Sequence, residues 1–467
     1  MIAQPPAASS TSARSPANAP QRPRAARSAR AVRLALRAAA LAAGAAAAVL
    51  AAACLAPAPG LYDADEVRSI VMNRDRAAAL AAPLVLLAHE TTCHLAGSGP
   101  RETSEHRIWF IGDPDHPSCG EIARIRCDLQ LERLELRRCR IYRGGDTLEI
   151  PVEAWETGAV RGWPEASRHS WIEAGATLPP LAAGDLVDIA YTVHNRWSAA
   201  RMPANWEVFP LATPLGPTVE RHVVLTHASV ISGEAVVVGD PGRVIRHYGN
   251  IEPRFEVLTG NLPAAATDPH GPGAPRLLFS SETDWERMRS ALAPHYRYDL
   301  HTYEQAFAAP GDSIVAAAPA TRQRLAAALA FVDRRIARVG LPLAETRGFP
   351  RLAPAALEQR CADRLDRAVL VAAVARAARM KVDLYLAAGS GEAFRPDLPT
   401  PAQFDRVLLG VPLLEEGRTL LIDPWEGDLA AAERAAQGVA WIFGMTDDAA
   451  GFREVDEHGR LIPRNVP

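Results

Sequence analysis

The sequence predicts a multidomain α+β protein, with a β-sandwich-like domain at residues 61–300 and a second domain of helices and an antiparallel sheet at residues 301–460. Residues 67–275 alternate short apolar runs with Gly, Pro and Asp, which is typical of strands joined by tight turns in packed sheets. From residue 316 onward, apolar residues recur instead at three- and four-residue steps, which is the period of a helix. The length of 467 residues is enough for two or three domains that each bury a core.

Strand patterns recur through the first domain. The turn Gly144-Gly145-Asp146 separates two strand-like runs within residues 141–150. Further strands are expected at residues 186–193, 222–225 and 235–238. The tryptophans of this region are predicted to belong to the core or to sheet edges, with a carbohydrate platform as the alternative. They are Trp155, Trp163, Trp171, Trp197 and Trp206.

The second domain is predicted to begin with helices at residues 316–339 and 355–380. Residues 368–375 are eight consecutive apolar residues, which is typical of a helix that is buried on all sides. Strands are expected at residues 382–387, 407–414 and 419–422, with Glu415-Glu416-Gly417 joining the last two as a tight hairpin. A central helix is therefore expected to pack against an antiparallel sheet.

The N-terminus predicts export. Residues 1–37 carry seven arginines and no acid, in a Pro-, Ser- and Ala-rich segment that is expected to be disordered. Residues 38–58 are uncharged and alanine-rich, and they are predicted to be a signal peptide or a signal anchor retained in the membrane. The basic residues are 50 arginines and one lysine. This bias suggests a GC-rich bacterial genome, and hence the periplasm or cell envelope as the destination.

Cysteine positions agree with export. An even number of cysteines, four within 47 residues, predicts two disulfides whose three connectivities remain open, and these residues are Cys93, Cys119, Cys127 and Cys139. No CxxC motif is present, so no metal site is predicted. Cys54 follows Leu50-Ala51-Ala52-Ala53, which is similar to a lipoprotein cleavage box and makes Cys54 a lipidation candidate. A small apolar residue within an alanine run is the simpler interpretation.

Residues 172–197 run from a Leu-Pro segment through a Gly-Asp turn into a strand that contains tyrosine. Asn261-Leu262-Pro263, Pro275 and Ser280-Ser281 then lead to Trp285. In this order the segments resemble a bacterial envelope domain of unknown function that commonly precedes transglutaminase-like domains. The resemblance implies a β-sandwich-like domain with a binding or scaffolding role.

Three motifs follow in the second domain, at residues 362–368 (ADRLDRA), 397–406 (DLPTPAQFDR) and 421–425 (LIDPW). They resemble the cysteine, histidine and aspartate motifs of the transglutaminase-like, papain-related core. The resemblance implies a nucleophilic cysteine at the start of the central helix, where the helix dipole lowers the thiol pKa, and a histidine that an aspartate orients. Here the cysteine position is Arg364 and the histidine position is Arg406, whereas Asp423 keeps the aspartate.

The sequence therefore predicts that this triad is not catalytic. No histidine occurs between His301 and His458, and arginine does not accept a proton at physiological pH. Cys361 lies three residues before Arg364, about 4–5 Å along a helix axis and out of reach of the usual partner. The alternative is a cysteine-dependent amidase, peptidase or transglutaminase that uses Cys361 with His458 or with a base from the first domain.

The substituted positions suggest a binding site. We expect Arg406 and Asp423 to lie nearly opposite each other in the hairpin and to form an ion pair, which leaves Arg364 free to bind a carboxylate or another anion. The alternative is that both arginines are surface residues of a degenerate cleft.

The function predicted from these features is binding or scaffolding in the bacterial envelope, by a protein whose transglutaminase-like domain is inactive. The alternatives are the cysteine-dependent enzyme and polysaccharide binding by tryptophans that share one exposed groove. No cofactor is predicted, and the partner is expected to be an envelope protein, a peptide or a glycan. Beyond residue 62 the chain carries 44 basic and 54 acidic residues, which excludes nucleic acid as the main partner.

Overall fold

The computed structural model describes residues 74–95, 101–129, 131–165, 167, 171–195, 205–228, 233–239, 244–247, 253–265, 269–270, 274–302, 305–346, 348–389, 394–446 and 451–455. All of them belong to one compact unit, Leu61–Pro467. The predicted basic region at residues 1–37, the predicted signal at residues 38–58, and Cys54, Trp197 and His458 lie outside the described residues. Among the helices that are described, none is both long enough and apolar enough to cross a membrane.

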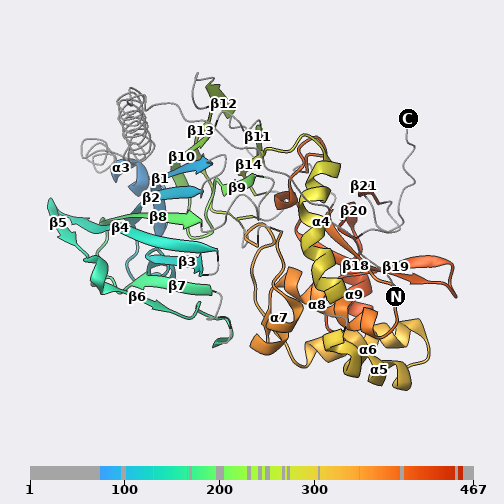
Figure 1. Cartoon of the computed structure of the whole chain (residues 1–467). Helices are drawn as coiled ribbons and strands as arrows, with labels where there is room; N and C mark the ends of the chain where they lie inside the picture. The colour runs from blue at the N-terminus through green and yellow to red at the C-terminus, as the bar shows by residue number, and fades with distance from the viewer. Residues whose placement is uncertain are drawn as a thin grey trace, which may run out of the picture. The chain divides into compact units, whose positions relative to one another are not determined.

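The fold is α+β and rich in β-structure, as predicted (Figure 1). Its helices are α3 (Arg74–Ala78), α4 (Trp285–Thr302), α5 (Ala308–Ala317), α6 (Thr321–Asp333), α7 (Ala353–Gln359), α8 (Arg364–Ala377) and α9 (Leu429–Ala435). Short 3₁₀ turns lie at Pro117–Gly120, Val152–Ala154, Gln305–Phe307 and Pro401–Gln403. We call residues 74–280 the β-rich region and residues 285–455 the helical region.

An eight-stranded sheet organises the β-rich region (Figure 1). In spatial order its strands are β12 (Val244–His247), β13 (Arg254–Leu262), β10 (Thr218–His227), β1 (Leu84–Leu95), β2 (Glu102–Ile111), β8 (Leu186–Asn195), β4 (Glu132–Arg143) and β5 (Asp146–Glu149). Neighbouring strands are antiparallel, except that β1 and β10 run parallel. The predicted turn at Gly144-Gly145 joins β4 and β5 as a hairpin, because both glycines supply the positive φ that such a turn requires.

Two small sheets cover one face of the large sheet. They are β11 (Glu234–Val238), β14 (Arg276–Ser280) and β9 (Trp206–Pro210), and β3 (Arg124–Asp128), β7 (Trp171–Ala176) and β6 (Trp155–Gly158). The first packs through a core that joins Phe209 and Phe279 to Val223 of the large sheet. The second packs through a core that joins Ile125 to Ile189. The face of the large sheet between these two cores is polar, and the functional site lies there.

Helix α8 is the buried centre of the helical region, as predicted from its apolar run. Helices α4, α5, α6 and α7 pack around it, together with an antiparallel sheet. The strands of that sheet, in spatial order, are β19 (Arg418–Ile422), β18 (Arg406–Leu413), β17 (Asp383–Gly389), β20 (Val439–Gly444) and β21 (Gly451–Glu454). Strands β18 and β19 form the predicted hairpin.

Two predicted helices differ from the structure. The helix expected at residues 355–380 is interrupted, because Arg360 has a left-handed conformation (φ 55°) that ends α7. Cys361–Ala362 then forms β16, and the Asp363 side chain caps α8 by accepting from the amide of Asp366. The helix expected at residues 316–339 is α6, which ends at Asp333 and is followed by a two-residue strand, β15 (Ala337–Arg338), that pairs with β16.

The predicted domain boundary between residues 300 and 301 falls inside helix α4. Leu292 and Tyr296 of this helix pack in the same core as α8, and that core also includes Trp206 of β9 and Leu278 of β14. The β-rich and helical regions therefore share apolar packing, since a continuous helix and two strands contribute to one core.

The predicted disulfides are not formed in the structure, in which the candidate cysteines are buried thiols. Cys93 lies in the core beneath the β11-β14-β9 sheet. Cys119 and Cys139 lie together in the other core, beneath the β3-β7-β6 sheet.

Candidate functional site

A cleft of about 1010 Å³ lies between the β-rich and helical regions, within the usual size range of ligand sites. Strands β1, β2 and β10 line its floor, β3 and β7 line one side, β9 lines the other, and the helical region lines the remaining wall. The residues that line this cleft include His89, Glu105, Arg107, Arg221, Arg126, Val208, Arg364, Asp405 and Trp425.

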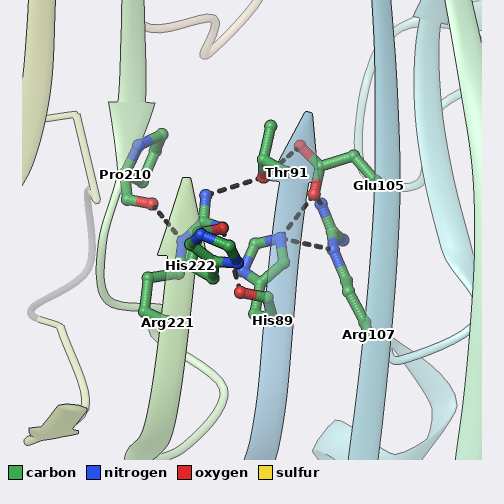
Figure 2. Close-up of polar contacts among 7 residues, drawn as sticks. All are labelled: His89, Thr91, Glu105, Arg107, Pro210, Arg221 and His222. Atoms are coloured by element: carbon green, nitrogen blue, oxygen red, sulfur yellow. Dashed lines mark hydrogen bonds and ion pairs between the residues drawn. The ribbon is translucent and has the colours of Figure 1, made fainter. Parts of the chain in front are cut away.

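Five side chains form a polar network at the base of this cleft, which we call the polar floor (Figure 2). Glu105 contacts the ring of His89 and accepts a 2.9 Å hydrogen bond from the Thr91 hydroxyl. Arg221 donates to Thr91 Oγ1 at 2.8 Å and to the His89 carbonyl oxygen at 3.1 Å. Arg107 Nη2 lies 3.5 Å from Glu105 Oε2. In the strand register, His89 lies opposite both Arg107 and Arg221, so adjacent strands bring the five residues together.

Burial and mutual contacts set the charge of the polar floor. Burial, reinforced by Arg221, lowers the pKa of His89 from 6.5 to about 3, so the imidazole is neutral at physiological pH. Burial opposes ionisation of Glu105, but contacts with His89, Arg107 and Arg221 hold its pKa below the usual range. The polar floor therefore has one carboxylate and two guanidinium groups at neutral pH.

Arg364 is the first residue of α8, the position predicted for the catalytic cysteine. Its Nη1 donates a 2.7 Å hydrogen bond to Asp423 Oδ2, and its guanidinium carbon lies 5.1 Å from the Trp425 ring centroid. Asp423 also accepts a 2.9 Å bond from the amide of Trp425. Burial raises the pKa of Asp423, and the Arg364 charge partly offsets that rise.

The expected Arg406–Asp423 ion pair is wrong, and so is the expectation that Arg364 is free. Arg406 Nη1 donates instead to the carbonyl oxygens of Ala435 and Gln437, at 2.9 and 3.1 Å. The hairpin register explains the difference, because Leu409 pairs with Ile422. Asp423, the residue after β19, therefore lies across from Leu408, which is two residues along β18 from Arg406. Arg364, at the start of α8, contacts Asp423 instead.

Asp405 lies directly before Arg406 and lines the cleft. Burial raises the pKa of this carboxyl, although Arg406 and Arg364 act in the opposite direction. Its Oδ1 is buried and has no hydrogen-bond partner among the described residues. This oxygen is therefore a buried acceptor on the cleft wall.

Cys361 is fully buried in β16 and does not line the cleft. Its carbonyl oxygen accepts a 3.1 Å hydrogen bond from Arg351 Nη2. Burial raises the pKa of the Cys361 thiol, which is the opposite of what a nucleophile requires. The structure thus provides no activated thiol in the described part of the helical region.

We expect Cys361 in the native protein to resist alkylation. A buried thiol with a raised pKa has neither the access nor the thiolate that iodoacetamide requires. Peptide mass spectrometry after timed labelling, with and without urea, should show modification of Cys361 only in the unfolded sample. Rapid modification of the native protein would revive the cysteine-dependent enzyme.

Three of the five tryptophans predicted as core or edge residues line the cleft, namely Trp163, Trp171 and Trp206. Trp163 and Trp171 are half-buried and meet edge to face, with 6.0 Å between ring centroids. Trp206 is buried and stacks on Phe349. Trp155 packs against the core beneath the β3-β7-β6 sheet, away from the cleft.

The polar floor was not among the sites predicted from the sequence. Its signal is visible in the strand at residues 84–95, where His89 and Thr91 occupy positions that share a face with the buried Cys93. A charged or polar residue on the inward face of a sandwich strand indicates a polar site. The alternation was obscured because a register shift between Leu86 and Ala88 reverses which residues face inward.

No family model matches the sequence, and no curated protein matches it. The crystal structure of a candidate protease from Parabacteroides distasonis ATCC 8503 is similar, with a TM-score of 0.65 and 13% sequence identity over 80% of this chain and 72% of that chain. At this identity, the likeness shows a shared fold. An M1 zinc metallopeptidase from Deinococcus radiodurans aligns over 42% of each chain with 10% identity and a TM-score of 0.24, which is too low to carry an argument.

Proposed function

We propose that this chain is an exported envelope protein that binds a ligand in the cleft, beside a transglutaminase-like domain that has lost its catalytic residues. The observation that carries the proposal is the 2.7 Å Arg364–Asp423 bond at the head of α8. An ion pair occupies the position where the nucleophile would stand, and it lines a cleft large enough for a ligand. The site therefore offers a cleft for recognition and has arginines in place of the cysteine and histidine that the resemblance implies.

The proposed envelope location is supported by the N-terminal sequence. Seven arginines precede the uncharged residues 38–58, which is the charge pattern of an export signal. Retention of that segment as a membrane anchor and lipidation of Cys54 are the alternative forms of attachment. The predicted disulfides, if they form on export, belong to the same proposal.

A peptidase is the second candidate, because the fold is shared with a protein described as a candidate protease. Two observations weigh against it for this chain. Cys361 is buried away from the cleft, and Arg364 and Arg406 stand where the thiol and imidazole would be needed. Binding without turnover is therefore the stronger proposal.

Blocking the cleft with Gly340→Trp tests this proposal. Gly340 lines the cleft, and a Cβ atom built there meets no atom within 4 Å, so the main chain leaves room for a side chain to start into the cleft. Calorimetric titration with short blocked peptides and with chitotetraose should show at least one probe that binds the wild type. We expect roughly tenfold or greater weakening of that binding in Gly340→Trp.

Gly158→Trp is the matched control, because a Cβ atom built at Gly158 also meets no atom within 4 Å and Gly158 does not line the cleft. It should bind the probe like the wild type. Equal affinities for the two variants would place the ligand elsewhere and overturn the proposal, as would the absence of binding to every probe.

A further inference from the structure

Strand β3 has one edge without a strand partner among the described residues. It is the last strand of the β3-β7-β6 sheet, and its Arg126 lines the cleft. The Ala176 amide donates to the carbonyl of Ala123, the residue directly opposite it. Because bonded residues alternate along an antiparallel pair, the odd-numbered residues of β3 form the main-chain bonds with β7. Arg126 lies between them, and its main-chain N–H and C=O therefore point away from β7.

Strand β9 is the end strand of the β11-β14-β9 sheet and lines the same cleft. The Leu211 amide donates to the Pro275 carbonyl, which assigns the odd-numbered residues of β9 to the bonds with β14. The main chain of Val208 then points outward. The Pro210 carbonyl confirms this direction, because it accepts a 3.1 Å bond from Arg221 of the polar floor (Figure 2).

Charges along the cleft are paired with one another. Arginines that line it contact a glutamate or an aspartate, as Arg101, Arg107, Arg124, Arg126, Arg161 and Arg364 do. Arg126, for example, reaches Glu345 at 3.2 Å, and Arg364 reaches Asp423 at 2.7 Å. A strongly charged ligand would have to compete with these internal partners, so the cleft favours a ligand without net charge.

The cleft also contains buried polar atoms that lack partners among the described residues. Trp109 is 2% exposed and lines the cleft, and its indole N–H has no acceptor. Asp405 Oδ1 is a buried oxygen without a donor. Because unpaired buried polar groups are costly, these atoms favour a ligand that both donates and accepts hydrogen bonds.

We propose that the cleft binds an extended, uncharged peptide segment through main-chain hydrogen bonds to the outward edges of β3 and β9, an inference that rests on the proposed binding function. A peptide in extended conformation carries alternating N–H and C=O groups with the repeat of a strand edge. Sugar hydroxyls also donate and accept without charge, but they lack that repeat. The two edges therefore favour a peptide over a glycan.

Proline substitution at the outward positions tests the main-chain contact. The full chain would be titrated, by fluorescence polarisation, with a labelled pool of short blocked peptides rich in Val, Thr and Ser. Arg126→Pro removes the outward N–H, whereas Arg126→Ala keeps it and removes only the side chain. Because that N–H is not used in the β3–β7 ladder, the strand should tolerate proline. Val208→Pro and Val208→Ala form the corresponding pair on β9.

We expect each proline variant to bind the pool roughly tenfold more weakly than its alanine counterpart. Near-ultraviolet circular dichroism checks that each variant is folded. If a proline variant is not folded, the same contact is tested on the wild type with main-chain N-methylated peptides, which should not bind.

The inference is overturned if both proline variants bind like their alanine counterparts, or if N-methylated peptides bind as well as unmodified ones. Binding of chitotetraose alone, weakened by Gly340→Trp, would overturn the peptide assignment and leave the proposed binding function in place. Peptide binding that Gly340→Trp does not weaken would instead count against both the peptide assignment and the proposed binding function.

Discussion

Replacing Asp366 by alanine is expected to reduce the free energy of unfolding by about 3–5 kcal/mol, the cost of breaking a buried ion pair. Asp366 is 1% exposed, and its two carboxylate oxygens accept 2.6 Å hydrogen bonds from the main-chain N–H and the Nε of Arg351. The variant would remove the carboxylate that accepts from Nε of the largely buried Arg351 guanidinium and from its main-chain N–H. Arg351 also donates a hydrogen bond to the Cys361 carbonyl, so the same network supports Cys361–Ala362. Loss of Asp366 should therefore loosen the start of α8.

Urea unfolding followed by circular dichroism measures this change. Asp397→Ala is the matched control, since Asp397 forms an ion pair with Arg395 in which the side chains are 62% and 38% exposed. Exposed pairs contribute less than about 1 kcal/mol, so this variant should be nearly as stable as the wild type. Comparable losses for the two variants would show that burial of the Asp366 pair is not what stabilises the helical region.

Replacing Glu105 by alanine is the second large effect, again about 3–5 kcal/mol of unfolding free energy. Glu105 is the carboxylate of the polar floor, and its removal takes a counter-charge away from Arg107 and Arg221 and the acceptor away from the Thr91 hydroxyl. Arg221 is 1% exposed, so water cannot replace the lost charge. Glu149→Ala is the control, because Glu149 pairs with Arg140 at the exposed β4–β5 hairpin.

The polar floor should also make stability fall as the pH is lowered. Between pH 6.5 and about 3, His89 takes up a proton in the unfolded chain but not in the folded protein, so acidification favours unfolding. The lowered pKa of Glu105 acts in the same direction, because its stabilising contribution is lost as the pH falls below the unfolded value of 4.5. Unfolding titrations across this range should show a smaller pH dependence for His89→Gln. An unchanged slope would contradict the assignment of a neutral buried imidazole.

Local sequence patterns were sufficient for several elements. The apolar run at residues 368–375 identified the buried α8, and Glu415-Glu416-Gly417 identified the β18–β19 hairpin. Both depend on neighbouring residues, through helical periodicity and turn chemistry. The end of α7 at Arg360 was missed, because a left-handed conformation at a residue other than glycine depends on the surrounding contacts.

The site could be predicted only in part. The arginines at residues 364 and 406, the positions that the resemblance assigns to cysteine and histidine, could be identified from motif order alone. Their partners were not, since Arg364 and Asp423 are far apart in sequence and meet only after α8 packs against the β18–β19 sheet. The cleft was also not predicted, because its floor depends on the register of β1 with β2 and β10.

The sequence by itself determined which chemical groups are present: arginines stand at two of the three positions that the resemblance assigns to a triad, and no histidine lies between His301 and His458. These facts hold for any arrangement of the chain. The tertiary structure decided that Asp423 neutralises Arg364, that Cys361 is buried, and that residues of the end strands β3 and β9 line one cleft. Hydrogen bonds and ion pairs act over a few ångströms, so they depend on distances that only packing and strand register set.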